Sequence, residues 1–194
     1  MNAVTSRLST QAQPVRFTAS DFETVVRSGA LNRLGQTELR DGVIVEMVPQ
    51  FGAHGYAKAE LSYALRRALD AAASPLRVYT EVSLLLDEIN MPAPDITVFE
   101  AYAGDGPIPL AAVRLLIEIS VSTLADDLGS KRTLYAGAGV PEYWVVDVAG
   151  RAVHQFADPD TRKAEYGFVQ VSPFGKSIEA RSMAGLTLDG SVLP

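Results

Sequence analysis

The sequence predicts an α/β fold of the α+β kind, in which a central mixed β-sheet is flanked by helices. Segments with the two-residue period of strands alternate along the chain with segments that have the 3.6-residue period of helices. A chain of 194 residues can bury a core without disulfides, and this one has no cysteine. No run approaches eighteen apolar residues, so we expect no membrane-spanning helix.

Residues 1–16 are predicted to be a flexible N-terminal arm, because they are polar and show no period. Residues 17–194 are expected to form a single domain. Its first element is a helix in "FTASDFETVVRSG", with Ser20 as the N-cap, Glu23 at the capping-box spacing and Gly29 as the stop.

A hairpin and a long helix are expected next. "TELRDGVIVEMVP" alternates around Asp41-Gly42, a dipeptide typical of tight hairpin turns. From His54 to Ala73 the pattern is helical, and His54 and Lys58 fall at the N-terminal end of its inner face. That face is otherwise apolar: Ala57, Leu61, Leu65, Ala68, Leu69 and Ala72.

Three strands, a helix and further strands complete the chain. The strands are expected at 77–87, 94–100 and 113–120, and the helix follows from about 123, with Gly139 as its C-terminal glycine. "EYWVVDV" and "RAVHQFA" indicate a hairpin turned at Ala149-Gly150. The remaining residues alternate weakly and are expected to add edge strands.

Charge and motifs exclude several functions. The net charge is −6, so tight non-specific DNA binding is not expected. The absence of cysteine excludes thiolate zinc sites and cysteine nucleophiles, and no P-loop or G-x-S-x-G element occurs. The N-terminus lacks the apolar core of a signal peptide, and we expect a cytoplasmic protein with no membrane partner.

The helix at 123–138 has a lysine in the middle of its buried face. At 100° per residue, Lys131 lies near the centre of the arc formed by Leu124, Asp127, Leu128, Leu134, Tyr135 and Ala138. An inward ammonium needs acidic partners. Asp95 and Glu118 lie on the less apolar faces of the two preceding strands, so pairing of these strands would bring both carboxylates to the lysine.

Two converging carboxylates favour a hard divalent cation such as Mg²⁺. A lysine beside them would orient or deprotonate a metal-bound water, or offset charge on a phosphorane oxygen. The sequence therefore points to metal-assisted phosphodiester hydrolysis by Asp95, Glu118 and Lys131.

Four segments resemble the Uma2 family, a group described as restriction endonucleases within the PD-(D/E)xK superfamily. They are "LRDGVIVEMVPQFGAHG", "PAPDITVF", "LLIEISVST" and "DLGSKRTLYAGAGVPEYWVVD", and the resemblance runs from about residue 38 to 157. It implies a restriction-endonuclease-like fold and an endonuclease that hydrolyses DNA with Mg²⁺, which Mn²⁺ can replace.

By this resemblance Asp95 is the PD aspartate and Glu118 the acid of the (D/E)xK element, both as metal ligands. Ser120 stands where the superfamily usually has its lysine, and Lys131 is the migrated lysine, in the family's D-x-x-x-K with Asp127. A third acidic ligand is left open among three residues, of which the first is favoured: Glu46, Glu60 and Glu81.

Other candidates have structural alternatives. Asp127 orients Lys131, caps the helix or binds metal, and the two residues also have the spacing of a simple i, i+4 ion pair. Ser120 is expected to line the site. His54 lies in the family's "HG" and is otherwise a core or capping histidine.

Three functions are compatible with these residues. The first is a Mg²⁺-dependent DNA endonuclease, for which a homodimer would cut both strands of a duplex. The second is a binding or interaction module that keeps the nuclease fold without catalysis. The third uses Asp95 and Glu118 as an acid/base pair on a substrate such as a glycoside.

Overall fold

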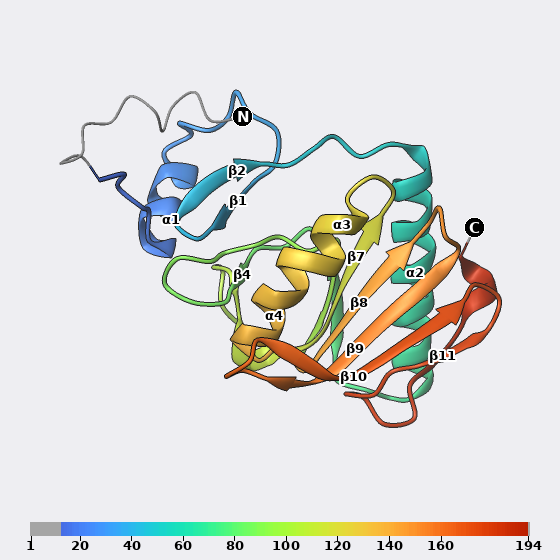
Figure 1. The fold of residues 1–194 in the computed structure, drawn as a ribbon. Coiled ribbons are helices and arrows are strands. Elements are labelled where there is room, and N and C mark those ends of the chain that lie inside the picture. Colours follow the sequence, from blue (N-terminus) through green and yellow to red (C-terminus); the bar gives the residue numbers. More distant parts are fainter. Residues whose placement is uncertain (1–12, 194) are drawn as a thin grey trace.

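The computed structural model describes residues 13–193 and confirms the predicted mixed sheet flanked by helices. The sheet has the strand order β10-β9-β8-β7-β5-β3, of which β10 to β7 are labelled in Figure 1. β7 and β8 are parallel, and the other neighbours are antiparallel. The strands are β3 (Arg77–Thr80), β5 (Ile96–Phe99), β7 (Val113–Ser120), β8 (Glu142–Asp147), β9 (Ala152–Asp160) and β10 (Glu165–Pro173).

Helices cover the two faces of the sheet (Figure 1). On one face α2 (Gly52–Ala71) packs its stripe of Ala57, Leu61, Leu65 and Leu69 on alternate residues of β5 and β7. On the other face lie α3 (Leu124–Asp126), a π-helical segment η3 (Asp127–Lys131) and α4 (Arg132–Ala138). The helical segments α3 to α4 connect the parallel strands β7 and β8, as a parallel pair requires.

A small unit of one helix and a hairpin lies beside the sheet. It consists of α1 (Ala19–Arg27), β1 (Thr37–Arg40) and β2 (Val43–Glu46). An isolated antiparallel bridge between Leu39 and Met91 links this unit to the segment that precedes β5. The hairpin turn at Asp41-Gly42 is confirmed. The predicted cap is wrong: Thr18, not Ser20, caps α1 in a capping box with Asp21, because Ser20 already lies inside the helix.

The predicted strand at 77–87 is also wrong in its extent. It breaks after Thr80, because Glu81 adopts the left-handed conformation with φ +55°. A short parallel pair follows, β4 (Leu84–Leu85) with β6 (Ile108–Pro109), and the 3₁₀ turn η2 (Leu110–Ala112) leads into β7.

The C-terminal residues only partly form edge strands. β10 is an edge of the main sheet, whereas β11 (Ser177–Glu179) and β12 (Thr187–Asp189) form a separate pair, followed by the 3₁₀ turn η4 (Gly190–Val192). Ile178 and Leu188 of this pair join the apolar cluster around α2.

The N-terminal expectations fall partly outside the description. Of the predicted arm, residues 1–12 lie outside the described residues, and residues 13–16 have no regular structure. The backbone amide of Phe17 donates to the carbonyl of Gly42, so the described chain joins the hairpin at this point. Within residues 13–193, no helix is both long and apolar enough to cross a membrane.

The helix that carries Lys131 differs from the regular α-helix that its period predicts. Residues 127–131 form a π turn, and the carbonyl of Asp127 accepts a hydrogen bond of 3.0 Å from the hydroxyl of Tyr143. A side chain that takes up a helix carbonyl disturbs the regular ladder at that point. Gly139 is confirmed as the C-terminal glycine, with φ +85°.

The Gly139→Ala variant should be less stable than wild type by about 1–2 kcal/mol, because a β-carbon is strained in the left-handed conformation. This added Cβ would also lie 3.2 Å from Cγ2 of Thr161. Urea denaturation followed by circular dichroism measures the effect. Gly55→Ala is the matched control, since Gly55 lies inside α2 with open space around it, and this variant should be as stable as wild type or more so. Equal stability of both variants would contradict the role of Gly139.

Candidate active site

A cavity of about 360 Å³ opens where the C-terminal end of β7 meets the N-terminal end of α2. The linker between β2 and α2 forms one wall, and residues 121–123 after β7, with Asp126 of α3 and Lys131 of η3, form the other. The charged groups that line it include Asp95, Glu118 and Lys131, which the sequence predicted to meet. The other charged or titratable residues in its lining are Arg40, Glu46, His54 and Asp126.

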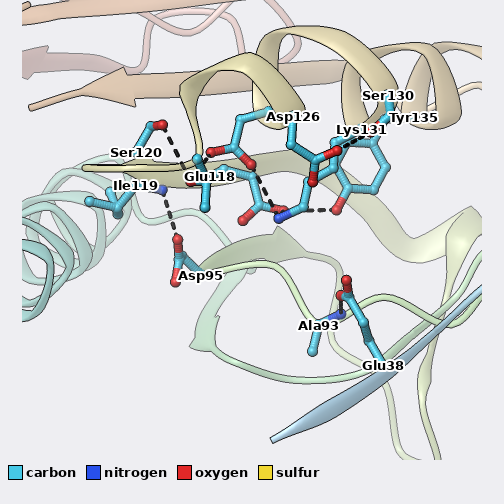
Figure 2. Close-up of polar contacts among 12 residues, drawn as sticks. Glu38, Ala93, Asp95, Glu118, Ile119, Ser120, Asp126, Ser130, Lys131 and Tyr135 are labelled. Atoms are coloured by element: carbon cyan, nitrogen blue, oxygen red, sulfur yellow. Dashed lines mark hydrogen bonds and ion pairs between the residues drawn. The ribbon is translucent and has the colours of Figure 1, made fainter. Parts of the chain in front are cut away.

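Glu118 and Lys131 form a buried pair, which is an ion pair when the Glu118 carboxylate is ionised. Oε1 of Glu118 lies 3.1 Å from Nζ of Lys131 and accepts a hydrogen bond of 2.9 Å from the hydroxyl of Tyr135. Figure 2 shows the Glu118 carboxylate turned toward the helix that carries Lys131 and Tyr135. Both contacts fall on Oε1, which leaves Oε2 for other ligands.

Asp95, immediately before β5, is held by different partners. Its Oδ2 accepts hydrogen bonds from the backbone amide of Ile119 at 2.7 Å (Figure 2) and from Nε2 of His54 at 3.0 Å. Its Oδ1 accepts one from Gln50 at 2.9 Å and lies 3.9 Å from Nζ of Lys58. Lys131 thus pairs with Glu118, whereas Asp95 is balanced by groups from α2 and the linker before it.

The surroundings shift the pKa values of Asp95 and Glu118 in opposite directions. Burial raises the pKa of Asp95, but the hydrogen bond and charge of His54, with the Ile119 amide and Lys58, lower it by more, so that it lies below its ordinary value. Burial raises the pKa of Glu118 to about 8 although Lys131 opposes this, and the nearby acids Asp95, Asp127 and Glu38 add to the rise.

The lysine stays protonated. Burial lowers its pKa, but the charges of Glu118, Asp127 and Glu38 raise it by more, and the net shift is upward. Of the roles expected for Lys131, the deprotonation of a water is therefore disfavoured, and orientation or charge compensation is favoured.

Asp127 and Ser120 flank this pair without lining the cavity. Oδ1 of Asp127 lies 3.2 Å from Nζ of Lys131, and its Oδ2 accepts a hydrogen bond of 2.6 Å from Thr123. The hydroxyl of Ser120 is 3.4 Å from that of Thr123. Asp127 is thus placed to hold Lys131, and Ser120 belongs to its hydrogen-bonded surroundings.

The three candidates for a further acidic ligand lie apart from the pair. Glu46 lines the rim of the cavity, where its Oε1 accepts a hydrogen bond of 2.9 Å from the Gly35 amide. Glu81 pairs with Nζ of Lys58 at 2.5 Å. Glu60 lies partly buried on α2. Within residues 13–193, no three acidic or histidine side chains come close enough together to bind a metal ion.

Sequence reasoning missed a further buried acid near the site, Glu38 of β1. Its Oε2 accepts a hydrogen bond of 3.2 Å from the Ala93 amide (Figure 2), and its Oε1 pairs with Nε of Arg40. Arg40 also reaches Oδ2 of Asp126 at 2.8 Å and so bridges the hairpin to α3 across the cavity. The sequence did contain a signal for this pair. Glu38 and Arg40 are two residues apart on one strand, so their side chains lie on the same face of it.

The carboxylate oxygens of Asp95 and Glu118 are ligand atoms of the type that a magnesium ion binds. Asp95 and Glu118 offer carboxylate oxygens on one cavity, and Mg²⁺ is commonly bound by one or two carboxylates while water and substrate oxygens complete its shell. Zinc sites instead need three or four protein ligands, which the described residues do not bring together.

Comparisons with known proteins show the family and the fold of the chain. The model of the family Uma2, described as "Putative restriction endonuclease", matches residues 20–191. A solved structure of a putative nuclease belonging to DUF820, from Anabaena variabilis, is similar with a TM-score of 0.69 and 18% sequence identity, over 93% of this chain and 97% of that one. No curated protein matches the chain. The predicted nuclease-type fold and family are thereby confirmed.

The Glu118→Gln variant should be more stable than wild type in alkaline solution and gain little in acid. The folded protein keeps the Glu118 proton up to a pKa of about 8, above its ordinary value of 4.5, so wild-type stability falls as pH rises through this window. Glutamine has no such proton to lose. Melting temperatures in EDTA at pH 5 and pH 9 test this, and a gap between the two proteins that is equal at both pH values would contradict it.

Proposed function

The chain belongs to the Uma2 family, and on that premise we propose that it is a divalent-metal-dependent endonuclease that hydrolyses phosphodiester bonds of DNA. Asp95, Glu118 and Lys131 are its proposed catalytic residues. The observation that carries the proposal is their convergence on one cavity from three separate elements, in the order of a PD-(D/E)xK site whose lysine has moved to the following helix.

The charge of the cavity favours a bound cation. Four carboxylates line it, against the two permanent cations Arg40 and Lys131, and both cations are already paired with acids. A phosphodiester is an anion and would be repelled by such a lining. A divalent cation held by Asp95 and Glu118 would supply the missing positive charge and Lewis-acid chemistry at the phosphate, and Mn²⁺ would serve as Mg²⁺ does.

The chain's own residues divide the remaining work. His54 and the Ile119 amide fix the direction of the Asp95 carboxylate by hydrogen bonds to Oδ2. Asp127 holds Lys131 in place from one turn earlier. Lys131, which stays protonated, is proposed to orient the attacking water or to stabilise negative charge on a phosphate oxygen, and Ser120 supports this arrangement through Thr123.

A second candidate is a binding module that keeps this fold without catalysis. It is favoured by the protein donors that already occupy both oxygens of Asp95, and by the net charge of −6. Cation binding separates the two functions, since only the nuclease needs it. The acid/base alternative predicts activity in EDTA. The proposal includes a homodimer for one purpose. Two copies related by a two-fold axis could cut both strands of a duplex.

Wild type should bind Mg²⁺ and Mn²⁺ in calorimetric titrations and nick supercoiled plasmid, and Asp95→Asn and Glu118→Gln should lose both properties, because each removes a carboxylate that would bind the metal ion. Asp105→Asn is the control, since Asp105 is exposed and does not line the cavity. Absence of metal binding in wild type would defeat the nuclease proposal and leave the binding module.

Lys131→Ala should lower the rate of cleavage by about 10²- to 10³-fold, the cost of removing one group that stabilises the transition state. Metal binding should persist, because the lysine is no metal ligand. Lys163→Ala is the matched control, since Lys163 is an exposed lysine paired with Asp160 and should cleave as wild type does. If Lys131→Ala lost metal binding together with cleavage, this division of roles would be wrong.

A further inference from the structure

We propose that the cavity accepts a single, unpaired nucleic acid strand, with one unstacked base resting on Phe51. The inference rests on the proposed nuclease function and narrows its substrate class. Single strands, flaps and frayed ends would be preferred to a continuous duplex.

The depth of the reacting groups is the first reason. Asp95, Glu118 and Lys131 are all almost fully buried at the inner end of the cavity. A scissile phosphate must therefore pass between the linker wall and the wall made by the residues after β7. Rotation about the bonds of an unpaired strand allows one phosphate to enter, whereas a paired strand carries its complement along and meets both walls.

The chemistry of the mouth is the second reason. The linker, residues 47–51, has no regular structure, and it exposes 66% of Val48 and 80% of Phe51 to solvent. Val121, in the opposite wall, is 47% exposed. Exposed apolar groups that gather at the entrance of a polar site are typical of a binding surface. Every nucleobase has a flat π face, and stacking on an aromatic ring accepts any sequence.

The charge balance indicates which contacts would hold the strand. Tight binding of nucleic acid usually relies on many phosphate contacts from lysine and arginine. This chain has 23 acidic and 17 basic residues, and the two permanent cations in the cavity lining are both engaged with acids. Affinity for the strand should then come largely from stacking at Phe51, in addition to the cation at Asp95 and Glu118.

The test compares strands and variants. A single-stranded 12-mer that contains 2-aminopurine, and the same strand annealed to its complement, are titrated with protein in Ca²⁺ in place of Mg²⁺. Anisotropy gives the affinity, and 2-aminopurine fluorescence reports stacking. Wild type should bind the single strand at least tenfold more tightly. Phe51→Ala should weaken this binding by roughly 5- to 100-fold, the range for the loss of one stacked base.

Two further variants sharpen the test. Phe51→Tyr keeps the ring and should restore wild-type affinity. Tyr102→Ala removes an exposed aromatic side chain that does not line the cavity, and it should bind as wild type does. Folding is no concern for Phe51, because its side chain lies mostly in solvent and makes no capping hydrogen bond.

The outcomes separate the inference from the proposed function. Equal affinity for both substrates, no binding of either, or an unchanged Phe51→Ala would overturn the inference, even if plasmid is nicked in Mg²⁺. Single-strand binding that depends on Phe51, without any cleavage of the 12-mer in Mg²⁺ or Mn²⁺, would uphold the strand site and defeat the nuclease.

Discussion

The buried ion pair between Glu118 and Lys131 is the interaction on which the rest of the site depends. Two charges removed from water cost several kcal/mol each, and their attraction offsets this only with good geometry and further hydrogen bonds. Here Tyr135 and Asp127 supply those contacts. Hydrophobic residues of similar volume could fill the same space, so stability alone does not explain the pair. The catalytic role proposed for both residues would explain it.

The helix geometry follows from this pair and its neighbours. Asp127 and Lys131 are both buried at the two ends of a π turn, and Tyr143 of β8 takes the Asp127 carbonyl. π turns inside α-helices are frequent at functional sites, since they place side chains that a regular helix would not. Glu118 lies on β7, and Tyr143 lies on the neighbouring strand β8. The pairing of these two strands therefore places Tyr143 to support Asp127, which in turn holds Lys131.

The cavity combines an excess of acid at its inner end with apolar groups at its mouth. Burial, with the nearby acids, raises the pKa of Glu118, and the acids keep Lys131 charged, which suits the proposal that a cation binds before a phosphate. The exposed side chains of Phe51 and Val48 offer apolar contacts to a strand at the mouth of the cavity. Such contacts would replace the phosphate contacts that a basic surface makes. One arrangement would thus serve both the proposed cation and the proposed strand.

The sequence by itself determined the direction of each side chain relative to its own helix or strand. The period placed Lys131 inward and set Glu118 on the opposite face from Ile117 and Ile119, and a glycine shortly before a proline marked Gly139 as the end of its helix. Only the tertiary structure decided which elements meet. Glu38 and Ala93 are 55 residues apart, and Arg40 and Asp126 are 86 apart, so no local pattern could pair them. Such contacts are set by the packing of the hairpin, sheet and helices, because spacing along the chain fixes a side chain's direction but not its distant partner.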